Sequence, residues 1–133
     1  MILNHYCSMV SYAIIVFCSL LFGKSFSPNE LNLKENLNFD QNEREYFVLY
    51  KTQLNYEIEG PIRLEIVSRR AIPEKSKRKY EFGYTLILND SEPLEIKHKK
   101  YKKDKMWSNE HPGHGYTQSG NTIINLPQGF HKI

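Results

Sequence analysis

The residues of this chain whose types and spacing could support chemistry gather in one segment, Tyr101 to Tyr116. Its central part reads Trp-Ser-Asn-Glu-His-Pro-Gly-His-Gly-Tyr and contains the single tryptophan of the sequence. Long segments without secondary structure of their own are uncommon in compact domains and often carry function. We therefore take five aromatic and imidazole side chains of this segment as candidate ligand-binding residues: Tyr101, Trp107, His111, His114 and Tyr116.

The aromatic side chains of this segment suggest a surface for a flat ligand. An exposed Trp107 with two tyrosines could stack on the sugar rings of a glycan or on another planar group. The competing interpretation is that Trp107 closes one end of the hydrophobic core, because a lone tryptophan usually buries its large surface. The sequence leaves both interpretations open.

The two histidines suggest a metal site instead. Neutral imidazoles and a carboxylate suit zinc or copper, and Glu110 or His98 could supply a third ligand. Pro112-Gly113 predicts a turn between the histidines, so ordinary loop histidines are the competing interpretation. A metal with an open position could support hydrolysis, but no general base or nucleophile is identifiable and the motifs of common enzyme classes are absent. We therefore expect no catalytic residue, no bound metal and no cofactor, with a metal-dependent hydrolase as the alternative.

Two clusters of basic residues suggest contact with an anionic partner, such as a polysaccharide, a lipid headgroup or an acidic protein. The competing interpretation is a solvated edge strand that lysines protect from pairing with neighbours. Acidic residues are interspersed and favour this second interpretation. The clusters are Lys97, Lys99, Lys100, Lys102, Lys103 and Lys105, and Arg69, Arg70, Lys75, Lys77, Arg78 and Lys79 in a predicted loop from Arg69 to Lys79.

The elements that must position these residues read as strands. Leu54, Tyr56 and Ile58 alternate with polar residues, and the longest alternation runs from Tyr80 to Leu88. Asn89-Asp90-Ser91-Glu92 predicts a turn after it. Because no stretch has the period of an amphipathic helix, the sequence predicts an all-β, antiparallel β-sandwich of the immunoglobulin-like or jelly-roll-like kind.

Interruptions separate the predicted strands. Gly60-Pro61 ends one strand or bends it, Lys102 to Asn121 reads as a long irregular stretch, and Pro127-Gln128-Gly129 reads as a turn. The alternation that follows from Phe130 stops at Ile133, which is short for a strand. We expect a sandwich that is incomplete at the C-terminus or that belongs to a longer parent chain.

The N-terminal region reads as an export signal. A mostly apolar run from Val10 to Phe22 is followed by the small residues Gly23 and Ser25, so we predict a signal peptide over residues 1–25, cleaved after Ser25. No Lys or Arg precedes the run, so the alternatives are an uncleaved membrane anchor and a lipid-modified Cys18. Both cysteines lie in this leader, and the mature chain would contain no disulfide. Residues 26–45 read as a polar linker or lead-in, and residues 46–133 as the β-sandwich domain.

A resemblance of limited specificity accompanies these patterns. Tyr56-x3-Gly60-Pro61-x2-Leu64-x3-Ser68-Arg69, the strand from Tyr84 to Leu88, and Pro127-x-Gly129-x-His131-x-Ile133 together resemble a pattern seen in uncharacterised secreted bacterial β-sandwich modules. In such modules the closing Pro-x-Gly-x-His forms a hairpin that leads into a longer strand. The resemblance implies fold and location, and it carries no catalytic residues.

The sequence therefore predicts a secreted, periplasmic or cell-surface module that is not an enzyme. Its expected role is to bind a glycan or an envelope protein, or to act as a structural or accessory domain. Nucleic acid is not an expected partner outside the cell, and contact with a membrane is expected only if the leader is retained as an anchor.

Overall fold

The chain is all-β in the computed structural model, which describes residues 14–20, 25–30, 33–50, 53–72 and 78–133. No helix occurs in these ranges, and hence none that could cross a membrane. The prediction of an antiparallel all-β chain is confirmed. The strands are β1 (Ile14–Leu20), β2 (Ser25–Phe26), β3 (Lys34–Phe39), β4 (Asn42–Leu49), β5 (Glu57–Ile72), β6 (Tyr80–Leu86), β7 (Leu94–Lys100), β8 (Trp107–Ser108), β9 (Gly115–Tyr116) and β10 (Gly120–Lys132).

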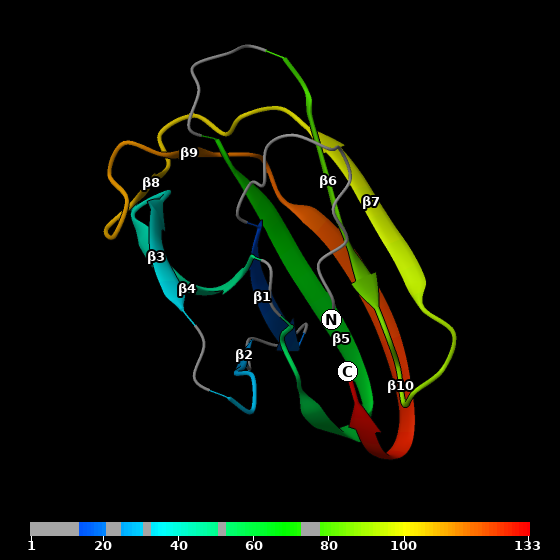
Figure 1. The fold of residues 1–133 in the computed structure, drawn as a ribbon. Coiled ribbons are helices and arrows are strands. Elements are labelled where there is room, and N and C mark those ends of the chain that lie inside the picture. The colour runs from blue at the N-terminus through cyan, green and yellow to red at the C-terminus, as the bar shows by residue number, and fades with distance from the viewer. Residues whose placement is uncertain (1–13, 21–24, 31–32, 51–52, 73–77) are drawn as a thin grey trace.

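Most of the strands belong to one large sheet with the order β10-β5-β1-β4-β3-β8. Strand β2 pairs with β1, and β9 pairs with the end of β5. Strands β6 and β7 form a separate hairpin. In Figure 1 this hairpin lies on the side of β5 and β10, whereas β3, β4 and β8 lie at the opposite side of the molecule.

The large sheet buries apolar side chains on both faces. Successive strand residues point to opposite faces, and Tyr46 and Phe47 accordingly belong to different hydrophobic clusters, as do Ile66 and Val67. The first cluster includes Phe82, Tyr84 and Leu86 of the β6–β7 hairpin, which covers one face. The second cluster is completed by Met106 and Tyr116, which belong to the segment between β7 and β10. Its buried members are Leu37, Tyr46, Val67, Ala71, Met106 and Tyr116.

Strand β1 occupies the middle of the large sheet, although it falls inside the predicted signal peptide. It pairs with β5 over seven residues and with β4 over three, and Val16 is fully buried. Residues 1–13 and 21–24 of the predicted leader lie outside the described residues. Cleavage after Ser25 would therefore remove a strand that joins β4 to β5 in this structure.

Two segments predicted as a linker and a loop contain strand residues, and residues 31–32 and 73–77 within them lie outside the described residues. Residues 26–45, predicted as a linker, contain β3 and the start of β4, with Glu35 and Leu37 buried. The predicted basic loop from Arg69 to Lys79 begins inside β5, where Arg69 and Arg70 are buried. In both places a charged residue occupies an inward-facing position, so the alternation of apolar and polar residues fails although the backbone is extended.

The predicted turn at Pro127-Gln128-Gly129 is instead an irregularity within β10. The register against β5 shifts between Leu126 and Gly129, and the backbone of Pro127 lies against Gly60. A Cβ on Gly60 would lie 1.9 Å from the carbonyl oxygen of Pro127, so the absence of a side chain allows this close approach. Strand β5 continues through Gly60-Pro61, as the prediction of a bent single strand allowed.

Candidate functional site

The segment between β7 and β10 is anchored to the large sheet at several points rather than left irregular. Strand β8 pairs with β3, and β9 pairs with the end of β5. Lys102 pairs with Thr117 in an isolated bridge, and the backbone amide of Gln118 donates to the carbonyl of Tyr101. These contacts close the segment into a cover over the second hydrophobic cluster and fix the positions of its histidines.

Ser108 and Glu110 hold the turn that carries the histidines. The hydroxyl oxygen of Ser108 accepts hydrogen bonds from the backbone amides of Glu110 and His111, at 3.2 and 3.1 Å. The Glu110 carboxylate accepts from the backbone amide of Asn36 at 2.8 Å and from its side-chain amide at 2.7 Å. Asn36 belongs to β3, so these bonds tie the turn directly to the sheet.

The hydrogen bonds to Glu110 determine its acidity. Partial burial raises the pKa of the Glu110 carboxyl, but hydrogen bonds from Asn36, from the amide of Glu110 itself and from Ser108 favour the ionised form and leave the pKa below its usual value. Glu110 therefore stabilises the turn, and its carboxylate oxygens accept hydrogen bonds from Asn36 and Ser108 rather than contacting the histidines.

Glu35 of β3 is the centre of the site. Glu35 is 2% exposed, and one carboxylate oxygen, Oε1, contacts three groups of the covering segment: the hydroxyl of Tyr116 at 2.5 Å, Nδ1 of His111 at 2.6 Å and the hydroxyl of Ser108 at 3.1 Å. Burial and the hydrogen bond to Glu35 raise the pKa of Tyr116 well above its usual range, so the phenol stays protonated and donates. A buried charge is stabilised when it is hydrogen-bonded in this way.

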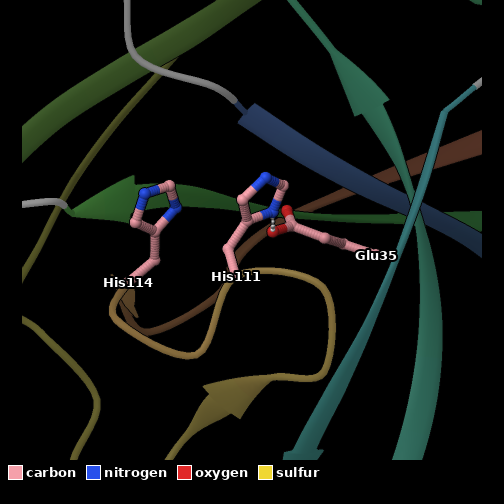
Figure 2. Close-up of side chains that lie close together, drawn as sticks. All are labelled: Glu35, His111 and His114. Atoms are coloured by element: carbon pink, nitrogen blue, oxygen red, sulfur yellow. Dashed lines mark hydrogen bonds and ion pairs between the residues drawn. The ribbon is translucent and has the colours of Figure 1, made fainter.

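The rings of His111 and His114 lie face to face beside this carboxylate. Their centroids are 4.9 Å apart and their planes differ by 6°. Figure 2 shows Glu35 meeting His111 from the strand, with His114 on the other side of His111. The backbone amide of His114 donates to the carbonyl of His111 at 3.0 Å, so the Pro112-Gly113 turn that the sequence predicts is present and brings the two rings together.

Glu35, His111 and His114 offer three potential metal-ligand atoms that lie within 4.8 Å of one another. Two imidazoles and one carboxylate match the donor sets of zinc and copper. Ligand atoms on one tetrahedral zinc ion lie about 3.3 Å apart, given bonds of about 2.0–2.1 Å. Metal binding therefore requires the stacked rings to turn toward a common point, and the exposure of the His111 side chain leaves it room to do so.

The other predicted ligand-binding residues do not form one exposed aromatic surface beside this group. Tyr116 is fully buried, and it contributes its hydroxyl to Glu35 rather than an exposed ring. Trp107 is 52% exposed on β8, so it does not close the core. Tyr101 is also exposed, and the Lys79 ammonium lies 5.2 Å from its ring centroid.

Neither predicted third ligand joins the histidines. His98 belongs to β7, where its ring packs against Phe82 and Tyr84 in the first hydrophobic cluster. Glu110 is committed to Asn36. The carboxylate that does join them, Glu35, was missed because it lies in the segment predicted as a linker. The spacing of Glu35, Leu37 and Phe39, which are three alternate residues of which two are apolar, was the sequence feature that could have indicated a strand here.

Lys97 and Lys99 are exposed on β7, which pairs with β6 and with no other described strand. Lys97 lies 3.8 Å from Glu95, and Lys99 lies 3.5 Å from Glu81 of β6. These contacts fit the interpretation of lysines on a solvated edge strand.

Comparison of the chain with protein families, with curated proteins and with solved structures gives no match, so the function has to be argued from this geometry.

Proposed function

We propose that this chain is an exported, non-catalytic β-sandwich module that binds a divalent transition metal ion, zinc or copper, through Glu35, His111 and His114. The observation that carries the proposal is the convergence of these three donors from two segments 76 residues apart in the sequence. The sandwich assignment is supported by the β6–β7 hairpin, which packs on one face of the large sheet. Export is supported by the composition of the N-terminal run, and it is proposed without cleavage after Ser25 because part of this run is β1 of the large sheet.

The surroundings of the three donors suit a bound cation. The Glu35 carboxyl group is buried and is held in place by its contacts with Tyr116, His111 and Ser108. A metal ion bound to Nδ1 of His111 would take the place of the hydrogen bond between this nitrogen and Oε1 of Glu35. Tyr116 and Ser108 would remain as partners of the carboxylate and keep it in place, as the outer hydrogen bonds of metal ligands do.

A zinc titration of the full chain by calorimetry tests this proposal. We expect one equivalent of zinc to bind, and we expect His111→Ala, His114→Ala and Glu35→Gln each to weaken the affinity by more than about 100-fold, since even outer partners of metal ligands contribute 10–100-fold. Two matched controls keep the affinity: Glu43→Gln, an exposed carboxylate that accepts from Asn109, and Trp107→Ala, in the same segment. Absence of zinc binding, or unchanged binding by a variant that combines His111→Ala with His114→Ala, would refute the proposal.

A second candidate function is glycan binding at Trp107, because its large ring is half-exposed on an anchored segment. A pull-down of the full chain with insoluble polysaccharides tests this candidate. We expect Trp107→Ala to lose retention while His111→Ala keeps it. Equal retention of the wild type and Trp107→Ala would remove the aromatic surface from consideration.

The metal-dependent hydrolase remains the catalytic alternative, and it shares the metal site. Two imidazoles and one carboxylate leave a coordination position for water, which bound zinc acidifies. Hydrolysis of an activated ester by the zinc-loaded chain, lost in His114→Ala, would favour this alternative over the non-catalytic module.

A further inference from the structure

The outer edge of β10 differs from the other exposed parts of the large sheet. Strand β10 pairs with β5 on one side, and no other described strand pairs with it. In an antiparallel strand about half of the backbone groups point away from a single partner, so an edge strand presents unpaired amides and carbonyls. Only part of this edge is available to a partner.

The second half of the edge is protected. The register irregularity between Leu126 and Gly129 bends the strand, and Pro127 has no amide hydrogen to donate. Beyond it the turn after β6 covers the edge: the amide of Asn89 donates to the carbonyl of Lys132, and the amide of Lys132 donates to the side chain of Asn89. Bulges, proline and covering loops are common means of blocking edge pairing.

The first half of the edge, residues 120–126, has none of these protections, although Gly120 is buried against the His98 ring of β7. Its sequence, Gly-Asn-Thr-Ile-Ile-Asn-Leu, contains no charge and no proline. No backbone hydrogen bond from another described segment reaches residues 121–126 apart from those to β5. Ile123 is 47% exposed on the face opposite the β6–β7 hairpin, whereas Leu126 lies in the first cluster and Ile124 packs against it.

This half of the edge is also complementary to itself. In an antiparallel pairing centred on Ile123, each Asn121 lies opposite Asn125 of the second copy, Thr122 lies opposite Ile124, and the two Ile123 side chains lie opposite each other. Directly opposite residues share a face of the sheet, so the exposed Ile123 of each copy is covered by the other. The uncharged strand meets no like charge across such an interface.

We propose that residues 120–126 of β10 pair with the same residues of a second copy, forming a symmetric dimer with a continuous sheet. A twofold axis perpendicular to the sheet at Ile123 produces this register, and it keeps both β6–β7 hairpins on the same face. Glu35 is on β3, and the turn with the two histidines follows β8. Strands β3 and β8 lie at the far edge of each sheet, so both metal sites stay accessible. This interface is independent of metal binding.

Analytical ultracentrifugation of the full chain over a concentration series tests the proposal. We expect the wild type to sediment with twice the monomer mass at high concentration. Ile123→Lys places two ammonium groups opposite each other, and Asn125→Lys places one near each end of the pairing, so both variants should be monomers. Leu94→Lys is the matched control, because it makes the same change at an exposed apolar residue of β7 and should remain dimeric.

Amide hydrogen exchange locates the interface. The outward amides of residues 121–125 should exchange more slowly in the dimer than in the Ile123→Lys monomer. A wild type that is monomeric at every concentration would overturn the proposal, as would a dimer that persists in both lysine variants. A monomer with protected amides at 121–125 would also overturn it and would assign this edge to another segment of the same chain.

Discussion

The hydrogen bond between Tyr116 and Glu35 allows the site to be tested without removing a ligand. Tyr116→Phe deletes the hydroxyl and keeps the ring, which is fully buried in the second hydrophobic cluster. The lost bond joins a hydroxyl to a buried group that carries a charge when Glu35 is ionised, and bonds to charged groups contribute about 1.5–3 kcal/mol. We therefore expect the free energy of unfolding to fall by about this amount, that is about 1.5–3 kcal/mol.

Urea denaturation followed by circular dichroism measures this loss, and Tyr80→Phe provides the matched control. The Tyr80 hydroxyl is buried and has no hydrogen-bond partner among the described residues, so its removal should cost nothing or stabilise the fold. In a Glu35→Gln background the bond at Tyr116 becomes neutral, and the cost of Tyr116→Phe should drop to about 0.5–1.5 kcal/mol. An equal loss of unfolding free energy in the two backgrounds, or equal effects of Tyr116→Phe and Tyr80→Phe, would refute the hydrogen bond from Tyr116 to a charged Glu35.

Three further predictions concern the turn, the hairpin and the first strand. The pKa of Glu110 is lowered in the folded state, so ionised Glu110 stabilises the fold at a pH above the usual pKa of 4.5, and this stabilisation is lost as the pH falls through the lower pKa of the folded state. The difference in unfolding free energy between the wild type and Glu110→Gln should therefore shrink in acid. A difference that stays constant from pH 7 to acid would contradict this. A Cβ on Gly120 would lie 2.3 Å from the His98 ring, so Gly120→Ala should displace the β6–β7 hairpin and cost about 1–3 kcal/mol in thermal or urea unfolding, whereas Gly113→Ala, with no atom within 4 Å, should be neutral. Deleting residues 1–25 removes β1 from between β4 and β5, so residues 26–133 alone should unfold at a lower temperature than the full chain in calorimetry; equal transition temperatures would show that the sheet does not depend on β1.

Strand content was the most predictable part of the structure. Where apolar and polar residues alternate, as from Tyr80 to Leu86, the sequence predicted the strand because burial of one face selects a period of two. The Asn89-Asp90 turn was also local: both residues have positive φ, at 49° and 57°, a conformation that Asn and Asp tolerate better than most residues. Such features depend on neighbours in the sequence.

The prediction failed where a charged residue points inward. Glu35 and Arg69 break the alternation of β3 and β5, because each is buried by partners from distant segments. Arg69 donates from Nε to the hydroxyl of Tyr46 and from Nη1 to the carbonyl of Thr117, and its guanidinium lies 5.2 Å from the Phe39 ring centroid. No local pattern indicates that such partners will be present.

The sequence by itself determined that the chain folds into strands and that its histidines share a turn, since both depend on short-range backbone and side-chain preferences. The tertiary structure decided which carboxylate meets those histidines. Glu35 reaches His111 because β3 pairs with β8 through Leu37 and Ser108, which are 71 residues apart, and through Asn38 and Trp107, which are 69 residues apart. Pairing of this kind is selected by burial across the whole sheet, so Glu35 replaced Glu110 and His98 as the third member of the candidate site.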